Sequence, residues 1–217
     1  PNLPFRALPE DLYRWLYDSR EKPFFLFLHG CDAHEPHVLA TQYDAKRFNP
    51  DYTGLLPSSH SELRQRFETD NNDDLRYDAF YQDQLNRIKT PQGLANADLA
   101  HLKALYDAQI YYLDQGLGGL FTALKNLHLT DRTVIIILSD HGQAFGEHGE
   151  YATHAQLYDE ITRTALIIKD PRRRLQGTRI TQVGQLVDVM PTVLELVGIP
   201  IPSGVVGRSL VPLLDNG

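Results

Sequence analysis

Two side chains that can bind a metal follow a strongly apolar run in the second half of the chain. Residues 134–138 read VIIIL, and after Ser139 come Asp140, His141 and a glycine. Once the chain turns at the glycine, a carboxylate and an imidazole can converge on one divalent cation. Such donors suit Mn²⁺ or Zn²⁺ and do not exclude Ca²⁺ or Mg²⁺. An Asp that caps a turn, with a His beside it, is the alternative interpretation of so short a pattern.

A second apolar run also ends in polar residues. Residues 24–29 read FFLFLH and lead into Asp32 and His34. If the two runs form neighbouring parallel strands, their carboxyl ends meet at one edge of the sheet, where open α/β sheets bind ligands. We therefore expect Asp140, His141 and His34 to deliver their functional groups into one pocket.

The elements that must position these residues alternate between helical and strand patterns. We predict helices over residues 9–20, 98–128 and 188–198, and further strands over residues 165–168 and 178–183. Helices between buried strands indicate an α/β fold, a layered sheet of mostly parallel strands with helices on both faces. In the long helix, apolar residues recur at three and four positions from Ile110 to Leu127 and predict a buried stripe.

Residues 38–97 form a variable insertion in this pattern. They are rich in Asp, Asn, Gln and Tyr, have no firm period, and predict one or two irregular helices. The stretch DNNDDL at 70–75 opens like a calcium loop, but it lacks the glycine and the glutamate of that loop, so we interpret it as a solvated acidic segment.

Composition excludes several classes of function. The chain has 217 residues and a net charge of −7, from 21 Lys and Arg against 28 Asp and Glu, which argues against a general nucleic-acid-binding protein. No run of 18 apolar residues predicts a membrane span. The single cysteine, Cys31, allows no disulfide within the chain. Nothing in the composition indicates a cellular location.

The segments that surround both strand ends resemble the sulfatase family of the alkaline phosphatase superfamily. Four stretches match the family's segments in the same order, and only residues 38–97 fall outside them. In chain order they are PFFLFLHGCDAHEPH, YDAQIYYLDQGLGGLFTAL, SDHGQAFGEHG with YATHAQLYDEITRTALII, and LVDVMPTVLELVGIPIPSGVVGRSLVPLL. The resemblance implies an alkaline-phosphatase-like fold and hydrolysis of small sulfate esters, with phosphate or phosphonate esters as the alternative substrates.

The resemblance also implies roles for four residues. Asp140 and His141 would be metal ligands, with Ca²⁺ favoured and Mn²⁺, Mg²⁺ or Zn²⁺ as alternatives. His34 would contact the transferred group or protonate the leaving oxygen, and His154 would stabilise charge on the oxygens of that group. His148, in Gly-Glu-His-Gly, is either loop scaffold or a substrate contact.

Two parts of the family pattern do not occur in this sequence. There is no Cys/Ser-x-Pro-x-Arg motif to supply the nucleophile, and the first Asp-Asp metal pair is missing. We therefore expect residues 1–217 to be the C-terminal part of a sulfatase-like domain, an incomplete fold that is inactive alone. Apolar sheet surface would then need a cover, which a homo-oligomer is one way to provide.

Two other hypotheses remain open at this point. The chain could be a naturally short, non-catalytic relative that binds anions or a partner protein, or an α/β scaffold whose histidines have no chemical role. An upstream nucleophile motif would exclude the first, and metal titration separates the second from an enzyme.

Overall fold

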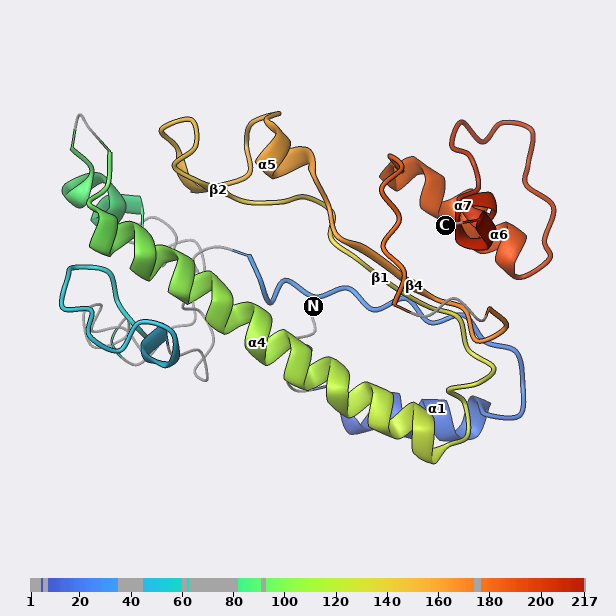
Figure 1. Ribbon diagram of the computed structural model, residues 1–217. Coiled ribbons are helices and arrows are strands. Elements are labelled where there is room, and N and C mark those ends of the chain that lie inside the picture. Colours follow the sequence, from blue (N-terminus) through green and yellow to red (C-terminus); the bar gives the residue numbers. More distant parts are fainter. Residues whose placement is uncertain are drawn as a thin grey trace. The chain divides into compact units, whose positions relative to one another are not determined.

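The computed structural model describes residues 5, 8–34, 45–59, 62, 82–90, 93–173 and 177–216. The chain divides into two compact units, each of mixed helix and strand content. The first comprises residues Pro1–Thr130 and His141–Arg163, and the second comprises Asp131–Asp140 and Thr164–Gly217. Figure 1 shows the helices and strands of each. No helix among the described residues is long and apolar enough to cross a membrane.

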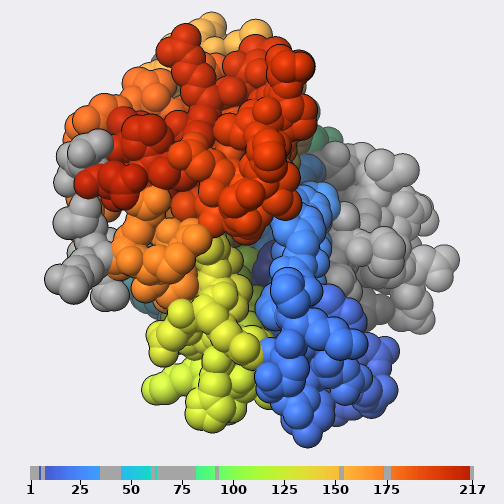
Figure 2. Space-filling view, turned by 90° about the vertical axis from the view of Figure 1, so that its right-hand side faces the viewer, coloured from blue at the N-terminus to red at the C-terminus, as the bar shows by residue number. Residues whose placement is uncertain are grey.

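Two of the predicted helices belong to the first unit. α1 spans Glu10–Ser19 and α4 spans Asn96–Asn126, so both predictions are confirmed to within two residues. α1 lies beside the C-terminal end of α4 in Figures 1 and 2. Leu16 of α1 is fully buried, and a Cβ added at Gly119 would meet the Tyr13 hydroxyl of α1 at 3.8 Å.

The core of the first unit lies on the N-terminal half of α4. Leu102 and Leu105 are fully buried there, together with residues of the segment that the sequence analysis assigned to an insertion. That segment contributes the short 3₁₀ helix η2 (Ala45–Arg47) and a helical stretch over 82–88. The core cluster consists of Ala45, Leu56, Leu85, Leu102, Ala104 and Leu105. DNNDDL lies outside the described residues.

The predicted apolar stripe of α4 is only partly buried. Leu120 and Leu124 are buried, but Ile110 is 42% exposed and Phe121 is 37% exposed. The deepest positions are instead at 101–109, because the segment 45–59 and the helical stretch 82–88 cover that end. The periodicity therefore predicted the helix correctly, but it placed the buried stripe too far towards the C-terminal end of the helix.

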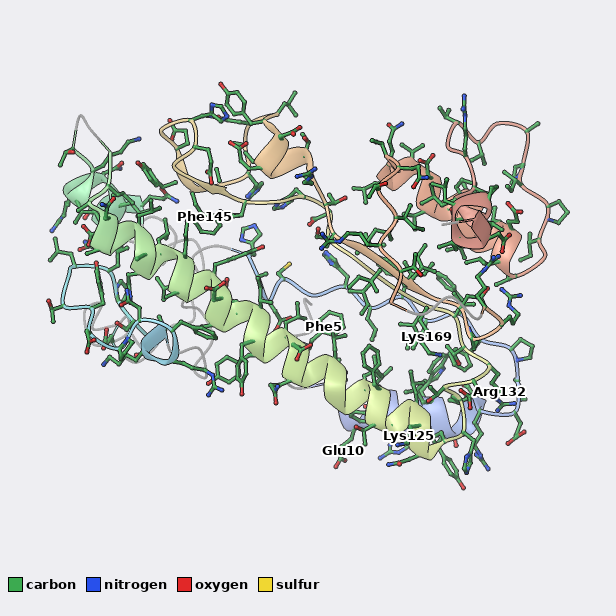
Figure 3. All side chains as sticks on the ribbon, in the orientation of Figure 1. Phe5, Glu10, Lys125, Arg132, Phe145 and Lys169 are labelled. Atoms are coloured by element: carbon green, nitrogen blue, oxygen red, sulfur yellow. The ribbon has the colours of Figure 1, made fainter. Side chains whose placement is uncertain are left out.

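A small hairpin completes the described part of the first unit. β2 (Ala144–Phe145) pairs antiparallel with β3 (Tyr151–Thr153), and the four-residue helix α5 (Asp159–Thr162) follows. Phe145 stands over α4 in Figure 3, where its ring meets Tyr106 edge to face with 5.2 Å between centroids. Burial, and secondarily the charge of Asp107, raises the pKa of Tyr106.

Residues 24–29 form no hydrogen-bonded strand with any described residue, contrary to the prediction. Exposure nevertheless alternates along them, since Phe25 and Phe27 are 76% and 72% exposed while Phe24, Leu26 and Leu28 are half-buried. The rings of Phe27 and His29 stack at 6.5 Å, as expected for side chains two residues apart on one side of an extended chain. The segment thus has the side-chain pattern of a strand without a ladder.

The second unit contains the other apolar strand. β1 (Ile135–Leu138) pairs with β4 (Leu166–Lys169), so the strands predicted at 134–138 and 165–168 are confirmed. This pairing is antiparallel. The parallel neighbour that the sequence analysis expected for 134–138 was residues 24–29, which form no ladder in the described chain. Residues 178–183 form no strand, so that prediction is wrong.

One buried carboxylate organises the helical part of the second unit. η3 (Leu186–Asp188) runs into α6 (Val189–Leu196), which ends just before Gly198 as predicted, and α7 (Val211–Asn216) follows. Asp188 Oδ2 accepts from the Gln185 amide at 2.9 Å, and Oδ1 accepts from the Arg208 amide at 2.8 Å. The Arg208 bond first, and then the Gln185 bond, lowers the pKa of Asp188. Asp188 therefore makes no side-chain cap bond to α6 itself, but stabilises the turn before α6 and fixes a distant loop.

Candidate functional site

Three histidines meet in the first unit. The rings of His141 and His154 stack nearly parallel, with 4.3 Å between centroids and 17° between planes. The ring of His34 meets His154 at 5.2 Å and 66°, edge to face. Each of the three comes from a different segment of the chain. The sequence analysis expected His34 and His141 to share a pocket, and here both contact His154.

The His141 loop is fixed by backbone contacts with the region of α5. The Gly142 amide donates to the Ile161 carbonyl at 2.6 Å, and the Gln143 amide donates to the Glu160 carbonyl at 3.0 Å. A Cβ added at Gly142 would lie 2.1 Å from the Glu160 carbonyl oxygen, a backbone atom that cannot yield. The glycine after His141 is therefore a steric requirement, since it lets the turn dock against α5.

The same turn fixes the tautomer of His141. Its Nδ1 lies 2.7 Å from the Gly142 carbonyl oxygen. A carbonyl oxygen can only accept, so Nδ1 carries the hydrogen, and in the neutral ring the lone pair is on Nε2. This is the arrangement that a metal-binding imidazole needs, with one nitrogen oriented by a carbonyl and the other able to bind an ion.

The loop that carries His34 is fixed at three points. Asp32 is buried, and its Oδ2 accepts from the Phe5 amide at 2.9 Å. The His34 amide closes a turn on the Cys31 carbonyl at 3.2 Å. The side chain of Gln109, from the middle of α4, donates from Nε2 to the His34 carbonyl at 2.9 Å. Asp32 thus anchors the loop to the backbone of Phe5, and Cys31 is an exposed loop residue.

Asp140 precedes His141 in the chain and belongs to the second unit. It is exposed. A carboxylate and an imidazole are donor types that a divalent cation accepts. In the part of the chain that the structure describes, however, no group of three or more His, Cys, Asp or Glu side chains could hold a metal ion. The two predicted ligands fit in chemistry and are too few on their own.

His148 lies in a separate cluster from these three rings. Its ring stacks on Tyr158 at 3.5 Å, and its Nε2 is 3.4 Å from Oε1 of Glu160. Its neighbour Glu147 accepts from the Phe145 amide at 2.6 Å and so fixes the hairpin. These contacts favour a scaffold role for the Gly-Glu-His-Gly loop, and the substrate contact stays a prediction for His148.

Sequence reasoning missed Gln109. It lies at an ordinary buried position of a long helix, and its partner is 75 residues away. The local sequence places this amide between Ala108 and Ile110, which does not reveal what the amide contacts.

Comparison with known proteins shows which family this chain matches. The family model described as Sulfatase matches residues 6–199. The N-acetylglucosamine-6-O-sulfatase of Bacteroides thetaiotaomicron is 34% identical over 111 residues, which are 51% of this chain and 20% of that protein. The multifunctional alkaline phosphatase superfamily protein PehA of Trinickia caryophylli is 29% identical over 211 residues, 90% of this chain and 38% of PehA.

Among solved structures, the phosphonate monoester hydrolase of Agrobacterium radiobacter has a similar fold. The TM-score is 0.61 at 23% identity, over 96% of this chain and 41% of that one. This chain therefore spans between a fifth and two fifths of the proteins named here. Because the family model covers most of the sequence, this chain belongs to the sulfatase family, and its fold is a part of the alkaline-phosphatase-like fold.

Proposed function

We propose that this chain supplies part of the active site of a metal-dependent hydrolase of small sulfate esters, and that it is inactive alone. The observation that carries the proposal is the meeting of His34, His141 and His154 in one cluster. Hydrolysis of phosphate or phosphonate esters is the second candidate, because both PehA and the phosphonate monoester hydrolase resemble this chain over most of its length.

In this proposal Asp140 and His141 are two ligands of a divalent cation, with Ca²⁺ favoured. The Nδ1 hydrogen bond of His141 supports this, because it leaves Nε2 as the basic nitrogen. When bound, the cation would act as a Lewis acid on the ester group and on the nucleophile. The remaining ligands and the nucleophile would come from polypeptide outside this chain.

His34 and His154 act on the ester itself. His34 is exposed and so can reach a substrate, and its ring donates a proton to the leaving oxygen. His154 lies between the other two rings, where an N–H donor can stabilise the negative charge that develops on the oxygens of the sulfuryl or phosphoryl group. His141 positions His154 through the parallel ring stack.

The test uses the complete polypeptide that contains this chain, loaded with Ca²⁺ or Mn²⁺. Turnover of p-nitrophenyl sulfate is compared with turnover of p-nitrophenyl phosphate and of a phosphonate monoester. His154→Ala and His34→Ala should each lower kcat by roughly 10²- to 10⁴-fold, as loss of a general acid or an oxyanion donor does. His128→Gly, at the far end of α4, is the matched histidine control and should leave kcat unchanged.

The results separate the hypotheses. A preference for the sulfate supports the first candidate, and a preference for the phosphate or phosphonate supports the second. Absence of turnover on every ester by the metal-loaded protein would remove both, and would favour a non-catalytic relative.

A further inference from the structure

Gln109 is an amide buried in the middle of a helix. Its residue is 1% exposed, among the most buried in the described part of the chain. Its neighbours in α4 include the buried residues Leu105 and Ala108. Burying an amide costs free energy unless its polar atoms are hydrogen-bonded, so its partner determines what it does.

The partner is the backbone of His34. Gln109 Nε2 donates to the His34 carbonyl oxygen at 2.9 Å. This bond joins α4, the longest helix of the described chain, to the end of the loop that follows residues 24–29. Since the carbonyl belongs to His34 itself, fixing it limits where the His34 ring can point.

Two other bonds shape this loop. The Asp32 carboxylate accepts from the Phe5 amide two residues earlier, and the His34 amide donates to the Cys31 carbonyl within its own turn. The bond from Gln109 differs from both, because it comes from a side chain of α4 and acts on His34 itself.

We propose that Gln109 is a positioning residue for His34, holding its backbone so that its ring meets His154. The role of His34 in ester hydrolysis rests on the function proposed above, whereas the positioning itself is a property of this chain. A displacement of about 1 Å in a reacting group can cost a hundredfold in rate, so one bond of this kind matters for activity.

The test compares two substitutions with a control in the same helix. Gln109→Met keeps the length of the side chain and removes the donor. Gln109→Glu keeps the shape and, when the carboxyl is ionised, offers only acceptors to a carbonyl. Leu105→Ala, one turn earlier and fully buried, damages the core without touching the loop.

The first measurement is the nuclear Overhauser effect between the His34 and His154 rings in this chain, with histidine labelled. It should be present in the unchanged chain and in Leu105→Ala, and lost in both Gln109 variants. In the complete, metal-loaded polypeptide, kcat should fall by roughly ten- to a hundredfold in the Gln109 variants, with a smaller change in KM.

The outcomes separate this proposal from the proposed function. A folded Gln109→Met chain that keeps the ring contact overturns the positioning role. So does loss of fold in both Gln109 variants while Leu105→Ala stays folded, because Gln109 would then be a folding residue only. Loss of the ring contact in a protein that turns over no ester would leave the positioning role intact and remove the proposed function.

Discussion

Replacing Asp188 by Ala should destabilise the second unit by about 3 kcal/mol at neutral pH. The carboxylate is buried and accepts from two backbone amides, of Gln185 and Arg208, at 2.9 and 2.8 Å. Hydrogen bonds to a charged group contribute about 1.5–3 kcal/mol each, and both amides would lose their acceptor in a largely buried place. Thr192 donates to the Asp188 backbone carbonyl, which the substitution keeps, so that bond should survive.

The dependence on pH gives this prediction its sharpest form. The pKa of Asp188 is lowered in the folded chain, first by the Arg208 amide and then by the Gln185 amide. A depressed carboxyl pKa contributes stability that is fully present above the unfolded value of about 4 and is lost as the pH falls through the folded value. The difference between the unchanged chain and Asp188→Ala should therefore be largest at pH 6 and shrink towards pH 3.

Urea unfolding followed by circular dichroism at pH 6 and at pH 3.5 measures that difference. Amide exchange over residues 185–211 at pH 6 reports whether the second unit is the part that loosens. Asp131→Ala, an exposed carboxylate in the same unit, is the control and should change stability by less than about 0.5 kcal/mol. A difference for Asp188→Ala that is below about 1 kcal/mol, or equal at the two pH values, would refute the reasoning.

Three further predictions concern the first unit. Gly118 is exposed within α4 and an added Cβ meets no described atom, so Gly118→Ala should raise the free energy of unfolding by about 0.5–1 kcal/mol, measured as a higher urea midpoint. His128 has φ +56° just after α4, so His128→Gly should raise the melting temperature, and no change would argue against strain there. Burial lowers the pKa of His101, so the stability of the chain should fall as the pH drops below about 6.5. In His101→Phe the urea midpoint, followed by Trp15 fluorescence, should vary less between pH 7 and pH 5 than in the unchanged chain.

Much of the local structure could be predicted from the sequence. The three- and four-residue spacing of apolar side chains predicted α1 and α4, and the β-branched run at 134–138 predicted β1. These features depend on residues close together in the chain, so periodicity is enough to find them. Gly198 ends α6 for an equally local reason, since its φ of +73° is one that a glycine adopts readily.

Pairing and burial could not be predicted in the same way. A continuous apolar run is typical of a parallel strand, but β1 pairs antiparallel with β4, and the choice of partner depends on the whole fold. Residues 24–29 likewise have the side-chain pattern of a strand but form no hydrogen-bonded ladder in the described chain, because pairing depends on a partner that the local sequence does not specify. The most buried part of α4 could not be predicted either, because the segment that covers it has no clear hydrophobic period.

Some residues of the candidate site could be predicted from local sequence, and others could not. His34, His141 and His154 could be proposed from motifs, because each stands in a stretch that resembles a segment of the family. Gln109 could not, since its function depends on a bond between residues 75 positions apart. The tautomer of His141 also follows only from the position of the Gly142 carbonyl.

The alternating exposure of residues 24–29 also bears on how this chain behaves at high concentration. Phe25 and Phe27 present two benzyl groups on the same side of an extended backbone, each more than two thirds exposed. Exposed apolar side chains of this kind favour association with the same residues of another molecule, and the extended backbone beside them can add hydrogen bonds to that contact. Light scattering by the purified chain should therefore rise steeply with its concentration, and charges at these two positions should suppress that rise.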